Sequence, residues 1–249
     1  MRENAPEFPA DLVLDEPGRG ARLVEEFYRQ YHVGDDDVNA DRQHVSAKAA
    51  FFRERLQTLG QGEGSLGLDA GCRTGLLIKS VGVLRWLGID LDEQALHAAR
   101  ASGIACRRMD FTFDLRLQDQ SFDAVMMTEV LEHLPYPMII VREVHRVLKQ
   151  RASSAFIGSV PLDYHLHRRW KVLRGKRLSG DQTHVHHFSF HELDQLLRFF
   201  FEKVDYLPLS GTATRHHWLR SWPNLFIRDI AWIASAPKEQ VGQWGVGKM

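Results

Sequence analysis

The sequence predicts an α/β fold in which helices wind on both faces of a doubly wound, mostly parallel sheet. Short apolar runs alternate with helical patterns through the middle of the chain, and the runs end at acids or at a glycine-rich turn. This alternation is typical of parallel sheets, which bind their ligands beyond the carboxyl ends of the strands. Residues that could bind a ligand are therefore expected where the strands end.

Composition fits one large domain with a sizeable core, because the 249 residues are 44% hydrophobic and 26% charged. The 32 basic and 32 acidic side chains balance, so any attraction to nucleic acid or membrane must come from a local patch. Cys72 and Cys106 are the only cysteines and form no CxxC pair, which fits a reducing, cytoplasmic location. We expect neither a signal peptide nor a membrane span, because no basic start followed by an apolar run and no run of 18 apolar residues occurs.

The N-terminal part is expected to be an extended lead-in followed by two amphipathic helices. Three prolines with interspersed acids fall in residues 1–20. Apolar residues then recur at helical spacing over 21–31 and 41–59. These helices would either cap a ligand site or pack on the sheet.

The first strand and its turn, residues 66–75, read LGLDAGCRTG and lead into Leu76. Glycines let a backbone turn with positive φ and approach a ligand closely, and the helix that follows offers free N–H groups. The spacing after Asp69 excludes both a P-loop and GxGxxG, since the glycines fall at Gly71 and Gly75. The turn is therefore predicted to hold a phosphate or a nucleoside in another way.

Two further strands end in acids. The strand at 83–90 ends at Asp90, which is placed to accept hydrogen bonds from ribose hydroxyls. The strand at 104–109 is followed by Asp110 and Phe111, an acid for an exocyclic amine and a wall for a purine. The alternation continues with a helix capped by Asp92, a strand at 122–127, a helix at 137–149, a strand at 155–160 and a helix from Phe190 whose capping box is Ser189 with Glu192.

The series LDAGCRTG, GID, MDF and SFDAVMMTEVLEHL, followed by the fifth strand, resembles the class I S-adenosylmethionine-dependent methyltransferases. The branch it most resembles is that of the ubiquinone and menaquinone biosynthesis enzymes (methyltransferase type 11), over roughly residues 60–210. The resemblance implies a Rossmann-like, seven-stranded sheet whose last strand is antiparallel, with 204–209 and 225–234 as the closing pair. It divides the chain into cap helices at 1–59, a methyltransferase domain at 60–236 with an insertion at about 161–188, and a flexible tail at 237–249.

The resemblance also implies S-adenosylmethionine as cofactor. The methionine part of the cofactor would be lined by Asp69, Gly71 and Gly75, and its ribose would be bound by Asp90 with the adjacent Leu91. Its adenine would be held by Asp110 and Phe111, and its amino group would meet the backbone around Thr128. One departure stands in the loop, which in the family usually reads DxGxGxG and here has Arg73 in place of the middle glycine. That side chain must point away from the cofactor or pair with its carboxylate.

Methyl transfer is an in-line displacement, so the protein mainly aligns the reactants and excludes water, with a base needed only for a hydroxyl acceptor. His133 in EVLEHL lies near the expected meeting point of acceptor and cofactor and is the candidate base. The alternative is that this histidine only satisfies local backbone groups.

The insertion is strongly basic. Arg168 and Arg169 begin a run of six basic residues in ten positions, interleaved with Trp170 and two aliphatic residues. Three interpretations stay open. The run is a helix face exposed to solvent, or a segment that closes over an anionic acceptor or contacts the membrane surface, or a binding site for single-stranded nucleic acid. Arg168 and Arg169 are the candidate acceptor contacts.

Three histidines close the insertion. His184, His186 and His187 suggest a metal, but no cysteine or nearby acid completes an evident site, so none is expected. The stretch GDQTHVHHFSFHEL resembles the family's segment before the penultimate helix, which implies that His184 lines the acceptor pocket and that His187 is structural.

The predicted function is methyl transfer from S-adenosylmethionine to a small-molecule acceptor, with a hydroxyl on a sugar-linked, lipid-linked or otherwise anionic compound favoured. The alternatives are an RNA or protein methyltransferase and a non-catalytic binding protein with the same fold. Neutral net charge disfavours nucleic acid, while peripheral membrane contact stays open.

Overall fold

The computed structural model describes residues 9–12, 44–178, 181 and 183–239. Its centre is a seven-stranded sheet, as the resemblance implies, and the strand order is β3-β2-β1-β4-β5-β7-β6. β1 to β5 pair in parallel, whereas β7 runs antiparallel to both of its neighbours. The strands are β1 Leu66–Ala70, β2 Arg85–Asp90, β3 Ala105–Arg108, β4 Ala124–Thr128, β5 Ala155–Pro161, β6 Phe201–Ser210 and β7 Asp229–Pro237.

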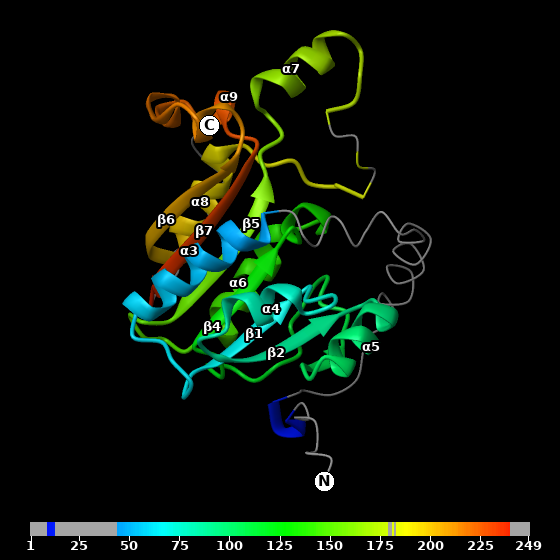
Figure 1. The fold of residues 1–249 in the computed structure, drawn as a ribbon, viewed down its shortest axis with the longest axis vertical. Coiled ribbons are helices and arrows are strands. Elements are labelled where there is room, and N and C mark those ends of the chain that lie inside the picture. Colours follow the sequence, from blue (N-terminus) through cyan, green and yellow to red (C-terminus); the bar gives the residue numbers. More distant parts are fainter. Residues whose placement is uncertain (1–8, 13–43, 179–180, 182, 240–249) are drawn as a thin grey trace.

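Helices cover both faces of this sheet (Figure 1). They are α3 Val45–Thr58, α4 Leu76–Val81, α5 Glu93–Ala101, α6 Pro137–Val147, α7 Leu166–Leu173, α8 Phe190–Phe200 and α9 Pro223–Phe226. Alternate residues of one strand belong to different cores: Val125 packs with α6 and α8, and Met126 packs with α3, α4 and α5. The predicted doubly wound architecture is therefore confirmed, and α3 packs on the sheet as well as lying near the site.

Local sequence signals explain where several helices begin. Asp92 accepts hydrogen bonds from the backbone N–H groups of Gln94 and Ala95 at the start of α5. Ser189 and Glu192 form the expected capping box of α8. The expected helix at 21–31 lies outside the described residues.

The last strand begins later than the apolar pattern suggested. Pro223 stands at the start of α9, where its fixed φ suits a first helical turn, so residues 225–226 are helical and β7 begins at Asp229. At the other end, β7 extends to Pro237 and the Lys238 N–H donates to the Phe200 carbonyl oxygen. The strand thus passes the predicted boundary at 236, and residues 240–249 lie outside the described part.

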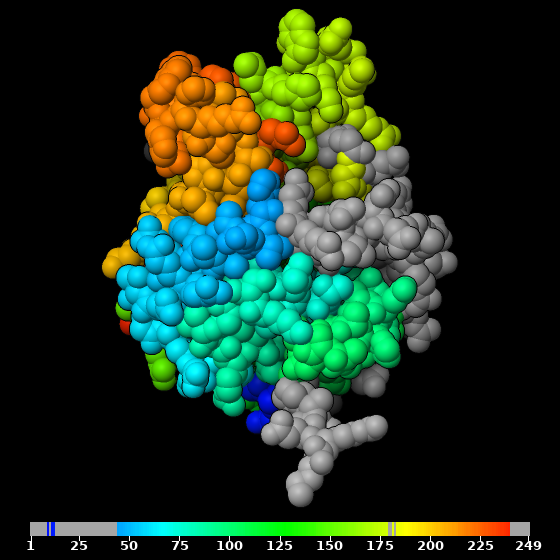
Figure 2. Space-filling view, in the orientation of Figure 1, coloured from blue at the N-terminus to red at the C-terminus, as the bar shows by residue number. Residues whose placement is uncertain are grey.

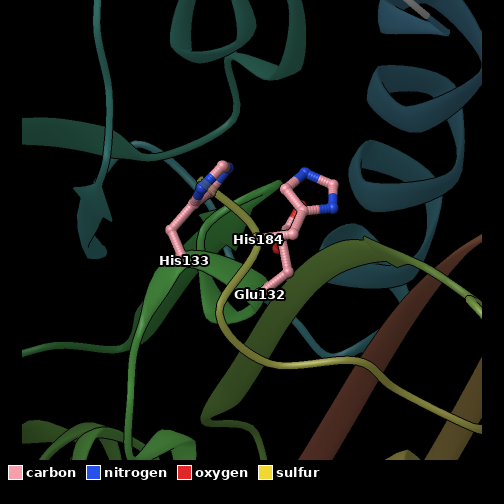
Figure 3. Close-up of side chains that lie close together, drawn as sticks. All are labelled: Glu132, His133 and His184. Atoms are coloured by element: carbon pink, nitrogen blue, oxygen red, sulfur yellow. The ribbon is translucent and has the colours of Figure 1, made fainter. Parts of the chain in front are cut away.

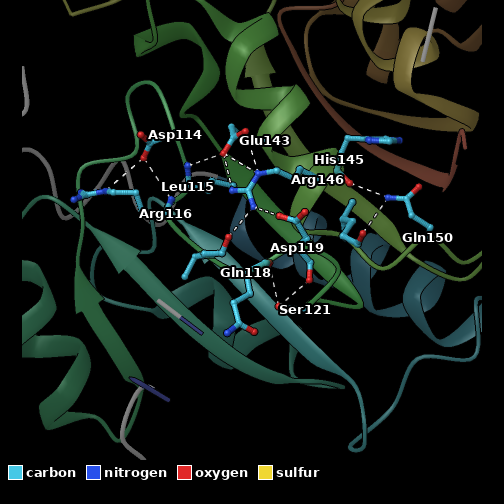
Figure 4. Close-up of polar contacts among 12 residues, drawn as sticks. Asp114, Leu115, Arg116, Gln118, Asp119, Ser121, Glu143, His145, Arg146 and Gln150 are labelled. Carbon is cyan, nitrogen blue, oxygen red and sulfur yellow. Dashed lines mark hydrogen bonds and ion pairs between the residues drawn. The ribbon is translucent and has the colours of Figure 1, made fainter. Parts of the chain in front are cut away.

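The loop between β3 and β4 is fastened to α6 by an ion network (Figure 4). Arg146 donates to Glu143 at 2.7 Å and to Asp119 at 2.5 Å, and Glu143 accepts the Leu115 N–H at 3.2 Å. These bonds hold the loop that follows Phe111 against α6. No helix among the described residues is long and apolar enough to cross a membrane.

Candidate active site

A cavity of about 830 Å³ opens at the carboxyl ends of β1, β2 and β4. Ten of the residues singled out from the sequence line it: Asp69, Gly71, Arg73, Asp90, Leu91, Phe111, Thr128, His133, Arg168 and His184. Gly75, Asp110 and Arg169 do not. The cavity therefore brings together the expected cofactor residues and the expected acceptor residues.

The two glycines in the turn after β1 are needed for different reasons. Gly71 has φ +91°, and a Cβ there would lie 2.4 Å from a methyl carbon of Val130, so the wall of the cavity needs glycine. Gly75 has φ +72°, and its Cβ would lie 2.0 Å from Ile104. Gly75 thus allows close packing beneath the turn and does not line the cavity. Arg73 adopts φ +43°, the left-handed region that a glycine would enter without strain.

Asp90 is fixed by the same turn. Its Oδ2 accepts the Arg73 N–H at 2.9 Å and its Oδ1 accepts the Asp92 N–H at 2.9 Å. Burial raises the pKa of Asp90, and the two backbone hydrogen bonds oppose that rise. Each carboxylate oxygen has a second lone pair, so Asp90 can still accept hydrogen bonds from a ligand's hydroxyls.

Asp110 turns back onto its own loop. Its Oδ1 accepts from the Thr112 N–H at 2.9 Å and from the Thr112 hydroxyl at 2.7 Å. This is an Asx turn, in which the short side chain caps the backbone two residues on. Phe111 and Thr112 line the cavity in place of Asp110.

An ion pair that the sequence analysis missed lies at the end of β4. Lys48 of α3 is only 5% exposed, and its Nζ lies 3.1 Å from Glu129 Oε1. The Ser159 hydroxyl donates to the same oxygen at 2.5 Å. Burial raises the pKa of Glu129, but Lys48 and Ser159 outweigh it and hold that pKa below its usual value. Glu129 therefore presents a charged carboxylate to the cavity.

Glu132 has the opposite character. It is 1% exposed, and neither carboxyl oxygen has a hydrogen-bond partner among the described residues. Burial, and then the charge of Glu129, raise the pKa of Glu132 well above its usual value. Its backbone oxygen accepts from the Val185 and His186 N–H groups, each at 3.0 Å, so it anchors the segment that carries His184.

His133 and His184 meet edge to face, with ring centroids 4.8 Å apart (Figure 3). The Nδ1 of His133 lies 3.2 Å from the Thr183 carbonyl oxygen. A carbonyl oxygen only accepts, so Nδ1 donates and Nε2 is the acceptor nitrogen of the neutral ring. Burial, followed by the charge of His133, lowers the pKa of His184 to about 4, so His184 is neutral at neutral pH.

The structure brings together a different set of possible metal ligands from the three histidines noted in the sequence. The group of possible metal ligands found among the described residues is Glu132, His133 and His184, whose ligand atoms lie within 4.8 Å of one another. It shares only His184 with the three histidines that suggested a metal. His187 instead lies with its Nδ1 2.5 Å from Asp163 Oδ2, which fits its predicted structural role.

The two candidate arginines separate. Arg168 lines the cavity and forms an ion pair with the fully buried Asp163, so Asp163 lies between Arg168 and His187. Arg169 is exposed, and its Nε donates to the Tyr164 carbonyl oxygen at 2.6 Å. The two side chains point in different directions, because adjacent residues of a helix lie about 100° apart around its axis and do not share a face.

Acidification is expected to destabilise the protein through His165 and His184. Burial is the largest cause that lowers the pKa of each to about 4, against about 6.5 in an unfolded chain. Between these values the unfolded state binds a proton that the folded state does not, so stability is full above pH 6.5 and falls towards pH 4. At pH 5 each histidine should cost about 2 kcal/mol relative to pH 7.

Urea unfolding at pH 7 and pH 5 tests this. The His165→Gln and His184→Gln variants should each lose less stability than the wild type over that interval. Equal losses in the wild type and in the double variant would contradict the assignment.

Part of the chain is similar to known proteins of one family. Residues 68–156 match the model of the methyltransferase domain family. The chain is 34% identical over 109 residues to the ubiquinone biosynthesis O-methyltransferase of Neisseria meningitidis, which covers 39% of this chain and 46% of that protein. It is 37% identical over 131 residues to the Idiomarina loihiensis enzyme of the same name, covering 41% of this chain and 54% of that protein. The chain thus spans about half the length of these curated relatives.

Solved structures show the same fold at low identity. An S-adenosylmethionine-dependent methyltransferase of Archaeoglobus fulgidus has 18% identity and a TM-score of 0.53, covering 75% of this chain and 94% of that one. A chain of a Haloferax volcanii complex that includes the Trm112 methyltransferase activator has 17% identity and a TM-score of 0.58, covering 90% and 100%. In its fold and in the sequence around its glycine turn, the chain is thus similar to the class I S-adenosylmethionine-dependent methyltransferases.

Proposed function

We propose that this protein transfers a methyl group from S-adenosylmethionine to a hydroxyl of an anionic small-molecule acceptor. The observation that carries the proposal is one cavity whose walls differ: the glycine turn and Asp90 lie on one side, and His133, His184 and Arg168 on the other. The name O-methyltransferase borne by the curated relatives supports a hydroxyl acceptor. The cysteine usage favours a cytoplasmic enzyme.

The residues on the β1–β2 side fit the cofactor. A glycine whose Cβ would collide with Val130 gives close backbone approach, and the buried Asp90 retains lone pairs for ribose hydroxyls. Leu91 and Phe111 supply apolar walls for the adenine. The backbone at Thr128 supplies a hydrogen-bond acceptor for the amino-acid end of the cofactor. When bound, S-adenosylmethionine supplies an electrophilic methyl group, and these residues align it and exclude water.

The residues on the other side fit an acidic acceptor. His133 presents Nε2 as the acceptor nitrogen and so can remove the proton of a hydroxyl as the methyl group is transferred. Arg168 and Arg228 both line the cavity, and guanidinium groups bind phosphate and carboxylate through paired hydrogen bonds. Arg168 is already paired with Asp163, which holds it in place for that contact.

Calorimetric titration with S-adenosylmethionine and S-adenosylhomocysteine tests the cofactor half. Micromolar binding supports the proposal and shows that Arg73 is compatible with the cofactor, whereas no binding favours a non-catalytic role for the fold. Transfer of labelled methyl groups to phosphate-linked sugars and lipids, with RNA and protein as parallel acceptors, tests the other half. Methylation of RNA or protein alone would overturn the choice of acceptor.

Asp90→Ala is expected to weaken S-adenosylmethionine binding by about 1 to 3 kcal/mol, because buried hydrogen bonds to a charged carboxylate are lost. Calorimetry measures the change, and circular dichroism checks that the variant is folded. The exposed Asp114→Ala variant is the matched control and should bind as the wild type does. Unchanged affinity in Asp90→Ala would refute the ribose contact.

A further inference from the structure

Exposed apolar side chains gather on two segments at one end of the molecule. Of the ten large apolar side chains exposed in the described part of the chain, seven lie within residues 164–173 and 218–222. They are Tyr164, Leu166, Trp170, Val172, Leu173, Trp218 and Trp222. Leu173 is 78% exposed and Trp218 is 74% exposed. Single exposed apolar residues are ordinary, but a cluster of this kind marks a contact surface.

The two segments lie side by side. α7 contacts α9, and Figure 1 shows both beyond the same end of the sheet, with the 3-10 turns of residues 212–221 next to α9. In Figure 2 they form two adjacent lobes at the top, yellow-green for α7 and orange for the turns. α7 has no buried residue, so packing does not account for its apolar side chains. We call the exposed residues of 164–178 and 211–222 the apical surface.

The apical surface is also basic. The sequence has no acidic residue between 164 and 178 or between 206 and 228, although the whole chain is neutral. Its basic side chains are Arg169, Arg174, Lys176, Arg177, Arg215 and Arg220, and the half-buried Lys171 lies among them on α7. Tryptophans beside lysines and arginines are the combination that binds the headgroup region of an anionic bilayer.

The surface adjoins the cavity. Arg168 belongs to α7 and Arg228 follows α9 by two residues, and both line the cavity. The apical surface therefore lies beside the side of the cavity assigned to the acceptor. A molecule held in a bilayer against this surface would have its headgroup near Arg168 and Arg228.

We propose that the apical surface docks on a membrane of anionic lipids and that the acceptor is drawn from that membrane. The second part rests on the proposed function, whereas the docking itself does not. The aliphatic side chains favour a bilayer over nucleic acid. Leu166, Val172 and Leu173 can enter the acyl boundary of a bilayer, whereas aliphatic side chains do not stack on nucleic-acid bases. The exclusively basic charge matches anionic headgroups.

Sedimentation with vesicles tests the docking in the full chain without any acceptor. Vesicles of equal parts phosphatidylglycerol and phosphatidylcholine should bind the protein, and phosphatidylcholine alone should bind it weakly. Each basic residue near an anionic surface strengthens binding about fivefold. Reversing four of them (Lys171→Glu, Arg174→Glu, Lys176→Glu and Arg177→Glu together) should therefore weaken binding at least about 100-fold.

The matched control carries the same charge change elsewhere. Lys79, Arg85, Arg142 and Lys203 are exposed on other elements, and their joint replacement by glutamate should leave most of the binding intact. Trp170→Ser with Trp218→Ser should weaken binding about tenfold or more without changing net charge. Tyr136→Ser, an exposed aromatic residue outside the surface, is its control.

No binding to anionic vesicles, or equal loss in the two charge-reversed proteins, would overturn the docking. Binding of a labelled single-stranded oligonucleotide without binding of vesicles would overturn it in favour of nucleic acid. Calorimetry with S-adenosylmethionine reports on the proposed function separately. If the protein binds the cofactor but no vesicles, the proposed function stands and the membrane docking is refuted. If it binds vesicles but no cofactor, the docking stands and the proposed function is refuted.

Discussion

His133→Asn is expected to lower kcat by about 100- to 10,000-fold, the usual contribution of a positioned general base, with S-adenosylmethionine affinity unchanged. The Nδ1 of His133 faces the Thr183 carbonyl oxygen, which leaves Nε2 as the nitrogen able to accept a proton. Asparagine keeps a polar side chain of similar reach but cannot remove a proton from a hydroxyl. Steady-state kinetics with the acceptor found by screening measures kcat, and calorimetry measures cofactor affinity.

Two further measurements separate a base from a structural histidine. The variant should recover part of its kcat at high pH, where hydroxide replaces the lost base, whereas a merely distorted site should not recover. His191→Asn, an exposed histidine of α8, is the matched control and should retain full activity. A His133→Asn enzyme within fivefold of the wild type would remove His133 from the chemistry.

The side of the cavity that we propose for the cofactor could be predicted because its signals are local. Asp69, Gly71 and Asp90 stand at strand ends, and a parallel sheet brings those ends to one edge whatever else the chain does. The sequence does not set side-chain direction in the same way. Asp110 follows its strand as expected but bends back onto Thr112, and Arg169 points away from the cavity that Arg168 lines.

The other side of the cavity depends on contacts between distant residues. Lys48 and Glu129 are 81 residues apart, and nothing in an amphipathic helix pattern indicates that one of its lysines is buried. The EVLEHL segment drew attention to His133, yet the opposite charge states of Glu129 and Glu132 follow only from burial and from the position of Lys48. The strand predicted from Leu225 likewise began too early, because an apolar run does not distinguish a strand from the short helix after Pro223.

The second large expected effect is a loss of stability on replacing Asp163, which lies in the connection between β5 and α7. Asp163 is fully buried and lies between Arg168 and His187. Asp163→Ala is expected to lower the free energy of unfolding by about 3 kcal/mol or more, because the largely buried guanidinium of Arg168 would lose its counter-charge. Urea unfolding at pH 8 measures this loss.

Removal of both charges separates the lost ion pair from the lost volume. In the Asp163→Ala, Arg168→Met double variant no unpaired charge remains, so it should be more stable than Asp163→Ala alone. The exposed pair of Asp205 with Arg55, at 3.8 Å, gives the matched control, and Asp205→Ala should change stability by less than about 0.5 kcal/mol. A loss below about 1 kcal/mol in Asp163→Ala would mean that Arg168 finds water or another partner. In that case Asp163 would not be what holds the guanidinium at the cavity, and the arginine would be free to follow the acceptor.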